Sequence, residues 1–309
     1  MKAVQYTRTG GPDVLEIAEI AEPTPAPGQV RVAVAASAFN AADNGMRAGT
    51  LPIPVRLPHV PGYDVSGVVD AVGDGVDDLA VGDAVVGFLP MTENGGAAEK
   101  VVAPAEAWVA APATVPLPDA AGLPSVALTA WQALFEHGEL RRGQRVLIVG
   151  AGGVVGTYAV ALAARAGAHV VATASARSIE KVRAAGADEI LDRDDTALAD
   201  GVTAPVDVLL NLAPLEPEEF AALVRLVRDG GRVVSATAWM PTPDDAERDV
   251  RGSTVFVRND REQLAELVAL VDAGELTIEV TRRIPLAELP ALHAEAAEHG
   301  ISGKVVILP

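Results

Sequence analysis

The sequence predicts a two-domain α/β protein, in which a β-rich domain accompanies a domain built on a doubly wound parallel sheet. Three observations carry this prediction. The chain has 309 residues, more than one hydrophobic core usually organises. Short valine-rich segments separated by glycine and proline dominate residues 1–118. From residue 119 onward strands alternate with helices, the pattern of a parallel sheet covered on both faces.

The β-rich part has few helical stretches and clear turn signals, such as Pro25-Ala26-Pro27-Gly28 and Val81-Gly82-Asp83. The strands predicted there are 2–6, 14–20, 30–36, 65–72, 84–88 and 98–102. After residue 273 the chain returns to short strands, 279–284 and 304–308, around a helix at 286–298. We therefore expect residues 1–118 and 276–309 to form one domain.

The remaining segment, 119–275, is the expected cofactor-binding domain. Its predicted helices are 119–137, 155–166, 179–185, 218–228 and 261–273. Its predicted strands are 145–149, 169–173, 189–191, 206–211, 232–236 and 254–257. Residues 146–164 are uncharged and apolar, but glycines divide them into a strand, a turn and a helix start, so we do not interpret them as a membrane span.

Composition excludes several classes of function. The net charge of −18 argues against a nucleic-acid or anionic-membrane partner, which would need clustered Lys and Arg. There are no cysteines, which excludes disulfides, a Cys nucleophile and thiolate metal sites. The N-terminus lacks the apolar run of a signal peptide, and we expect a cytoplasmic protein.

The sharpest motif follows the strand at 145–149. A run of glycines joins this apolar strand directly to an apolar helix. Glycines permit the tight turn and the close approach of a pyrophosphate, and the helix N-terminus offers free N–H groups and partial positive charge. This strand-turn-helix context indicates a Rossmann dinucleotide-binding site. Its expected cofactor contacts are Gly150, Ala151, Gly152, Gly153, Val154 and Val155.

The next strand indicates which dinucleotide binds. NAD-selective sites place Asp or Glu near the end of that strand, to bind the ribose 2′-hydroxyl. No acidic residue lies between His169 and Ile179. Ser175 and Arg177 are placed to hold a 2′-phosphate instead, Arg through charge-assisted hydrogen bonds. The sequence therefore predicts a preference for NADPH, although Arg177 as a solvated loop cation is the alternative.

Together with the glycine motif, several short stretches carry a family resemblance over almost the whole chain. The stretches are Phe39-Asn40-Ala41-Ala42-Asp43, Arg47-Ala48-Gly49, Pro61-Gly62-Tyr63-Asp64-Val65-Ser66-Gly67, Val81-Gly82-Asp83-Ala84-Val85, Ala127-Leu128-Thr129-Ala130-Trp131-Gln132-Ala133-Leu134, Gly186-Ala187-Asp188 and Gly303-Lys304-Val305-Val306. The chain resembles the quinone oxidoreductase (zeta-crystallin-like) branch of the medium-chain dehydrogenase/reductase family. Each stretch is weak alone, but their order and spacing are specific.

The resemblance implies a GroES-like β-rich catalytic domain, a Rossmann domain, and an active site in the cleft between them. It also implies that the nicotinamide lies near Asn40, Thr129 and a loop after the strand at 206–211. That loop consists of Asn211, Leu212 and Ala213. We add Phe256 and Val257, at the end of the last predicted strand, to the expected cofactor contacts.

The resemblance also bears on metal. Zinc-dependent relatives carry Gly-His-Glu where this chain has Gly62, Tyr63 and Asp64, and they use cysteine ligands that this chain lacks. Because catalytic zinc needs about three protein ligands, Asp64 alone is insufficient, and we expect a zinc-free enzyme. The five histidines show no metal-ligand spacing.

Three residues keep two interpretations each. Asn40 either contacts the substrate or only caps a helix over 41–48. Tyr63 either bonds a substrate oxygen or packs in the cleft. Arg193 stands where this branch often has Tyr, and it either adds charge near the 2′-phosphate or pairs with Asp192, Asp194 or Asp195.

The predicted function is transfer of hydride from NADPH to a small conjugated carbonyl substrate, a quinone or an enone, with Asn40 and Tyr63 as candidate catalytic residues. Two alternatives remain: a tailoring reductase for one enone or enoyl metabolite, and an NADPH-binding protein with a structural or regulatory role. We also expect a homodimer formed through the last strand of the Rossmann sheet, since pairing protects an apolar edge.

Overall fold

The computed structural model describes residues 1–194, 198–237 and 242–309, which form two compact units. One unit contains Met1–Ser125 and Asn259–Pro309, and the other contains Val126–Arg258. These limits differ from the expected domain ranges at both junctions. Helices α2 (Leu117–Ala120) and α7 (Arg261–Asp272), expected in the cofactor domain, pack in the first unit, α2 against β3 and β4 and α7 against β7. The functional assignment of the domains stays a prediction.

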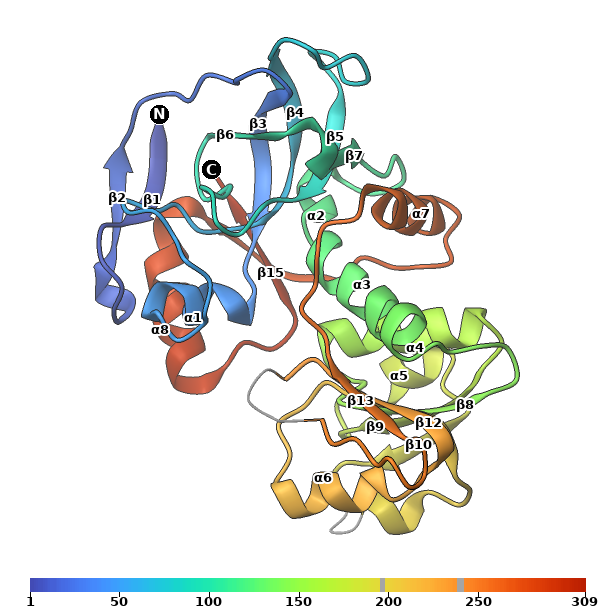
Figure 1. Ribbon diagram of the computed structural model, residues 1–309. Coiled ribbons are helices and arrows are strands. Elements are labelled where there is room, and N and C mark those ends of the chain that lie inside the picture. Colours follow the sequence, from blue (N-terminus) through green and yellow to red (C-terminus); the bar gives the residue numbers. More distant parts are fainter. Residues whose placement is uncertain (195–197, 238–241) are drawn as a thin grey trace. The chain divides into compact units, whose positions relative to one another are not determined.

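The first unit is built on a mixed sheet, seven-stranded within the described residues, with the order β14-β15-β3-β4-β5-β7 and with β6 paired to β3 (Figure 1). Its strands are β3 (Gln29–Ala38), β4 (Asp64–Val72), β5 (Ala84–Phe88), β6 (Lys100–Pro104), β7 (Trp108–Ala110), β14 (Val280–Pro285) and β15 (Lys304–Leu308). Strands β1 (Lys2–Tyr6) and β2 (Leu15–Glu19) form a separate antiparallel pair.

Short helices complete the first unit. Helix α1 (Ala41–Ala48) contacts α8 (Leu289–His299). Single 3₁₀ turns are η1 (Pro12–Val14), η2 (Ala105–Ala107) and η5 (Leu286–Glu288). A hydrophobic core cluster of this unit joins β1, α8 and β15, and includes Val4, Leu289 and Ile307.

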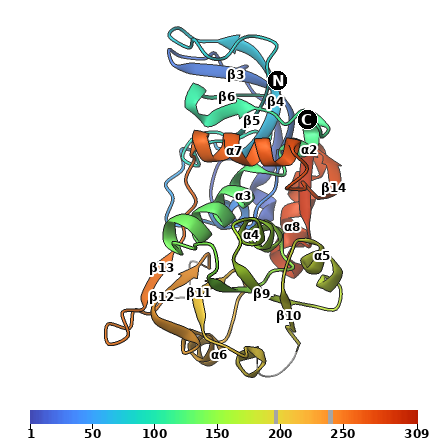
Figure 2. The ribbon, with the colours of Figure 1, turned by 90° about the vertical axis from the view of Figure 1, so that its right-hand side faces the viewer.

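The second unit contains a parallel sheet, six-stranded within the described residues, in the order β10-β9-β8-β11-β12-β13. The strands are β8 (Arg145–Val149), β9 (His169–Ala174), β10 (Glu189–Asp192), β11 (Val206–Asn211), β12 (Val227–Ser235) and β13 (Arg251–Thr254). Helices α4 (Val154–Arg165) and α5 (Ile179–Ala184) lie on one face and α6 (Pro217–Val224) on the other, with η4 (Leu198–Gly201) beside α6 (Figure 2). Burial of β8 and β11 on both sides explains their continuous apolar sequences.

Three predicted elements differ from the structure. The single helix expected at 119–137 is broken into α2, α3 (Pro124–Trp131) and the π-helix η3 (Gln132–His137), because Pro124 lacks the N–H that would continue a helix. The helix expected to reach residue 228 ends at Val224, and β12 begins at Val227, ahead of Gly230 with its positive φ. The last strand was expected at 254–257 but spans Arg251–Thr254, because these are the residues that pair with β12.

No helix in the described part of the chain is long and apolar enough to cross a membrane.

Candidate active site

The glycine turn lies at the carboxyl end of β8. Gly150 has a φ of 84°, a left-handed conformation that glycine adopts without strain. Gly156, in the first turn of α4, lies so close to this turn that an added Cβ would be 2.3 Å from the Gly150 carbonyl oxygen. The strand order reverses between β8 and β11, and dinucleotides bind at such a switch point, outside the carboxyl ends of the strands. The turn and the start of α4 therefore fit a pyrophosphate.

Two neighbouring loops border the turn. Thr173, near the end of β9, accepts a hydrogen bond from the Gly150 N–H to its Oγ1 at 3.0 Å. Beyond β11, the Ala213 N–H donates to Asn211 Oδ1 at 3.2 Å, and a Cβ on Gly150 would lie 3.1 Å from the Ala213 Cβ. The predicted contacts Gly150, Asn211, Leu212 and Ala213 are thus brought together by adjacent strand ends.

The loop after β9 holds the predicted 2′-phosphate residues. Ser175 is half-buried, and its backbone N–H donates to Ser178 Oγ at 3.1 Å. Ser178 also packs on the turn, because a Cβ on Gly152 would lie 2.3 Å from its Oγ. Arg177 is exposed and forms no ion pair with any residue that the structure describes. A cation without a counter-charge therefore follows Ser175.

The other predicted cofactor residues of this unit lie in varied surroundings. Ala151 is buried and Val154 and Val155 are half-buried at the start of α4, and Thr129 is half-buried in α3. Arg193 is exposed, and its Nε lies 3.5 Å from Asp194 Oδ1, while Asp195 lies outside the described residues. Phe256 and Val257 follow β13, and Phe256 is 66% exposed. Sequence reasoning did not include Ser178, although a serine at the start of a helix is a recognisable capping signal.

Asn40 lies in the first unit, two residues after the end of β3. Strand β3 has β15 on one side and β4 on the other, both antiparallel to it, so the end of β3 lies beside the first residues of both neighbours. These first residues are Lys304 and Asp64. The fold therefore places a cation and an anion on opposite sides of Asn40.

Four side chains form a compact cluster at this point. Lys304 Nζ donates to Asn40 Oδ1 at 2.7 Å and to Asp64 Oδ2 at 3.0 Å. Asn40 Nδ2 donates to Asp64 Oδ2 at 3.0 Å. Ser125 donates to Asp64 twice, from Oγ to Oδ2 at 2.6 Å and from its backbone N–H to Oδ1 at 2.8 Å. Lys304 and Asp64 are buried, whereas Asn40 is half-buried.

Three of these four residues were not predicted as site residues. Asp64 and Lys304 stand in stretches that carry the family resemblance, and Ser125 stands just before another, but nothing local links positions 40, 64, 125 and 304. A lysine directly before the apolar run Val305-Val306-Ile307-Leu308 would have been the signal, because a lysine that such a strand buries is usually paired.

Tyr63, the second catalytic candidate, lies in the core and is 2% exposed. Its hydroxyl is 2.6 Å from His59 Nε2. Burial lowers the pKa of His59 to about 4, so its ring is neutral, and burial raises the pKa of the Tyr63 hydroxyl well above its usual range. The Tyr63 hydroxyl and His59 Nε2 therefore share one hydrogen bond in the core of the unit, whichever of the two donates.

The Asp64 cluster does not fit a zinc ion. Among the described residues no group of three His, Cys, Asp or Glu side chains converges as metal ligands. Asp64 accepts four hydrogen bonds, about the number that a carboxylate can accept. One of the four donors is the Lys304 ammonium, whose charge would repel a divalent cation. Lys304 and Asp64 thus form an ion pair whose charges balance each other without a metal ion.

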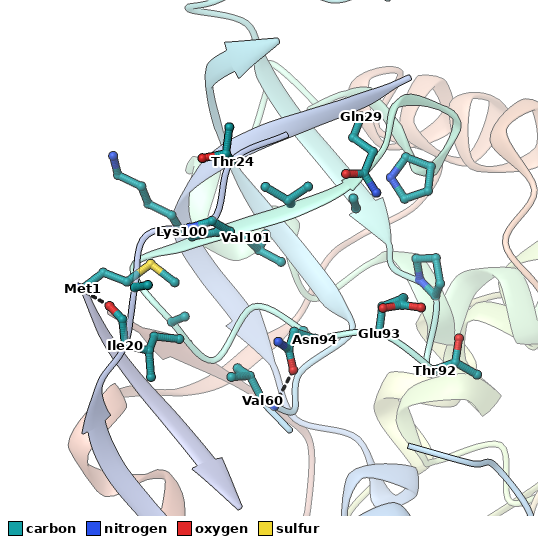
Figure 3. A pocket seen from close by; sticks show the side chains of 18 residues that line it. Met1, Ile20, Thr24, Gln29, Val60, Thr92, Glu93, Asn94, Lys100 and Val101 are labelled. Carbon is teal, nitrogen blue, oxygen red and sulfur yellow. Dashed lines mark hydrogen bonds between the residues drawn. The ribbon is translucent and has the colours of Figure 1, made fainter. Parts of the chain in front are cut away.

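A separate hollow of about 610 Å³ lies in the first unit, beside β6 and the segment before it (Figure 3). Its lining includes Met1, Asn94 and Lys100. Two hydrogen bonds shape its rim, from the Met1 ammonium to the Ile20 carbonyl oxygen and from the Val60 N–H to Asn94 Oδ1. None of the predicted site residues lines this hollow, so we do not assign it as the binding site of the carbonyl substrate.

Comparisons with known proteins find relatives that match both units of the chain. Residues 26–113 match the model of the alcohol dehydrogenase GroES-like domain, and residues 185–307 match that of zinc-binding dehydrogenases. The chain is 32% identical to the chloroplast envelope quinone oxidoreductase homolog of Arabidopsis thaliana, over all of this chain and 98% of that protein.

Solved structures are similar over the full length as well. A structure described as an NAD-dependent alcohol dehydrogenase has a TM-score of 0.88 and 30% identity, and each chain is covered completely. A mycobacterial protein solved in complex with NADPH has a TM-score of 0.86 and 29% identity, again with complete coverage of both chains. These likenesses confirm the predicted fold class, a GroES-like domain with a Rossmann domain.

Proposed function

Because the chain belongs to the quinone oxidoreductase branch of the medium-chain dehydrogenase/reductase family, we propose that it transfers hydride from NADPH to a conjugated carbonyl acceptor without zinc. Family membership makes the chain an oxidoreductase with a nicotinamide cofactor. The choice of NADPH, the class of acceptor and the independence from zinc are the proposal. The observation that supports a zinc-free reaction is the buried ion pair of Lys304 and Asp64 beside Asn40.

The glycine turn and the start of α4 would hold the pyrophosphate through backbone N–H groups and the positive end of the helix. Ser175 and Arg177 would hold the 2′-phosphate of NADPH. The loop of Asn211, Leu212 and Ala213 borders the same turn and would lie along the cofactor. When bound, the reduced nicotinamide supplies hydride, and the protein supplies position and electrostatics.

One of the similar structures is described as NAD-dependent. The preference for NADPH is therefore inferred from this chain's own residues. No acid follows β9 before α5, and Arg177 has no counter-charge in the described part of the chain. An unpaired guanidinium can form two parallel hydrogen bonds to a phosphate.

The acceptor class follows from what the cluster can do. A carbonyl that takes up hydride develops negative charge on its oxygen, and an unactivated ketone needs a Lewis acid or a placed proton donor. Asp64 already accepts four hydrogen bonds, three of them at Oδ2, and the Tyr63 hydroxyl is already hydrogen-bonded to His59 Nε2. A quinone or enone spreads the charge over its own conjugated system and then takes up one proton. One neutral donor, the half-buried amide of Asn40, is enough to stabilise such an oxyanion.

The test is NADPH oxidation with matched pairs of acceptors. Cyclohexenone against cyclohexanone, and a benzoquinone against its saturated diketone, differ chiefly in conjugation. We expect turnover of the conjugated member of each pair. Asn40→Ala should lower kcat/KM by the equivalent of about 1–3 kcal/mol of transition-state stabilisation, the scale of one lost hydrogen bond. Equal or faster turnover of the saturated members would overturn the acceptor class.

The same preparation tests the metal. Elemental analysis should find less than stoichiometric zinc, and a chelator should leave the rate unchanged. One zinc per chain together with loss of activity in the chelator would overturn the zinc-free proposal.

A further inference from the structure

The amide of Asn40 has one orientation in this cluster. Its Oδ1 accepts from the Lys304 ammonium at 2.7 Å, and its Nδ2 donates to Asp64 at 3.0 Å. Exchanging the oxygen and the nitrogen would set NH₂ against an ammonium and a carbonyl oxygen against a carboxylate, and both contacts would be repulsive. The two charged residues therefore determine which way the amide faces.

One hydrogen of the amide remains after these bonds. An Asn NH₂ group has two N–H donors, and within the described residues one acceptor, Asp64 Oδ2, takes a hydrogen bond from Nδ2. Asn40 is half-buried, unlike the fully buried Lys304 and Asp64. The second N–H is therefore the amide hydrogen that remains for an acceptor from outside the cluster.

We propose that Lys304 is a positioning residue of the acceptor site: its ammonium holds the Asn40 carbonyl oxygen and makes the amide a stronger donor to the acceptor's developing oxyanion. A cation at the carbonyl oxygen draws electron density from the amide nitrogen, which leaves its hydrogens more positive, and hydrogen bonds in such chains strengthen one another. Asp64 supplies the counter-charge that allows an ammonium to stay buried. This proposal rests on the oxyanion-binding role given to Asn40.

A purely structural role for the ion pair predicts other results. In that case Lys304 would only join β15 to β4 across β3, and its removal would lower stability without a specific effect on turnover. The two roles separate when charge balance is restored. Lys304→Met leaves Asp64 as an uncompensated buried charge, whereas Lys304→Met with Asp64→Asn gives a neutral cluster of similar volume.

The experiment is a double-mutant cycle on kcat/KM with a quinone or enone. Lys304→Met, added to Asp64→Asn so that the double variant is a neutral cluster, should lower kcat/KM by about 10- to 100-fold, the scale of one charge-assisted hydrogen bond. In an Asn40→Ala background the same change should have little effect, because the group through which Lys304 acts is gone. Lys304→Arg should restore part of the loss.

Two further measurements accompany the cycle. The side-chain amide resonances of Asn40, identified by their loss in Asn40→Ala, should move upfield in the Lys304 variant, whether or not cofactor is bound. Fluorescence titration with NADPH should give unchanged affinity. Lys100→Met is the matched control, because Lys100 is also ion-paired in this unit, with Glu22 and Asp70, but outside the cluster; it should leave kcat/KM unchanged.

The outcomes distinguish this inference from the proposed function. If Asn40→Ala has no effect on turnover, Asn40 does not stabilise the oxyanion of the acceptor, and both the proposed role of Asn40 and this inference are overturned. If Asn40→Ala slows turnover but Lys304→Met lowers it by the same factor in both backgrounds, Lys304 does not act through Asn40, and the inference alone is overturned. Unchanged amide resonances in the Lys304 variant would also overturn it.

Discussion

In the proposed function, Arg177 is the residue that selects NADPH over NADH. It follows Ser175 in the loop after β9, is exposed, and lacks an ion-pair partner among the described residues. Arg177→Ala should weaken NADPH binding by about 1–3 kcal/mol, the scale of a hydrogen bond to a charged group. NADH has no 2′-phosphate, so its affinity should hardly change.

Titration of both cofactors by fluorescence or calorimetry checks this prediction. Arg183→Ala is the control, because Arg183 is also exposed, lies in the adjoining helix α5 and pairs with Glu180. An equal loss for NADPH and NADH would show that Arg177 does not read the 2′-phosphate.

Asp43 is a residue whose protonation should affect stability. It is 2% exposed in α1, where its Oδ2 accepts from the Asn40 N–H at 2.7 Å. Burial, which disfavours the charged form, raises the pKa of Asp43 from 3.8 to about 7, although that backbone hydrogen bond opposes the shift. The folded protein therefore holds a proton that the unfolded chain releases at lower pH.

The sign of the pH effect follows. The stabilisation is fully present below the unfolded pKa of 3.8 and is lost as pH rises toward about 7. The neutral variant Asp43→Asn should therefore gain stability relative to the wild type between pH 4 and 7, by at most about 1.4 kcal/mol per pH unit. Buried His59 and His293, whose pKa values are lowered to about 4 and about 3, titrate in both proteins, so they cancel in the difference.

Denaturant unfolding of both proteins at several pH values measures this difference. Asp13→Asn, at a side chain that is 74% exposed, is the control and should show no such slope. A difference between Asp43→Asn and the wild type that does not vary with pH would contradict the protonation of Asp43.

At the scale of the element, the contact between α4 and the end of β8 decides whether the glycine turn can form. A Cβ on Gly156 would lie 2.3 Å from the Gly150 oxygen and 2.6 Å from the Ala151 Cα, both backbone atoms that cannot swing aside. Gly156→Ala should therefore push α4 away from the turn. We expect a loss of stability of about 1–3 kcal/mol, typical of overpacking, and weaker NADPH binding.

Gly153→Ala provides the matched control in the same turn. Its added Cβ would be 3.3 Å from the same Gly150 oxygen, and its φ of −74° suits any residue. Its unfolding midpoint should stay near that of the wild type. Similar midpoints for Gly156→Ala and Gly153→Ala would show that close packing of α4 is not what this glycine provides.

At the scale of the whole molecule, the edge strand β13 bears on assembly. The Gly252 N–H in this strand donates to Asp244 Oδ1 at 2.7 Å, so a side chain of the same chain already covers part of the edge. Phe256, just beyond the strand, is 66% exposed. We propose that a second copy of the chain covers Phe256 and the rest of this edge, because an open apolar edge favours association.

Light scattering at micromolar concentration checks the proposal. The wild type should have the mass of a dimer, and Phe256→Asp should shift it toward the monomer. Val81→Asp is the control, because Val81 is equally exposed at 66% but belongs to the first unit. A monomeric wild type would rule out the dimer at these concentrations.

The sequence by itself determined the elements whose signals are local. The bounds of β8, β11 and β15 agree with the predicted strands, because apolar runs ended by turn residues mark a buried strand. The glycine motif after β8 could be interpreted for the same reason, since a strand, a turn and a helix start occupy consecutive residues. The fold class and the family followed from the order of such local signals.

The tertiary structure alone decided what depends on distant residues. The limits of β13 follow from its register with β12, and the place of α2 in the first unit follows from its packing against β3 and β4. The cluster of Asn40, Asp64, Ser125 and Lys304 joins positions up to 264 residues apart. Strand pairing of β15 and β4 with β3 creates it, and side chains brought together in this way leave no spacing pattern along the chain from which the cluster could be inferred.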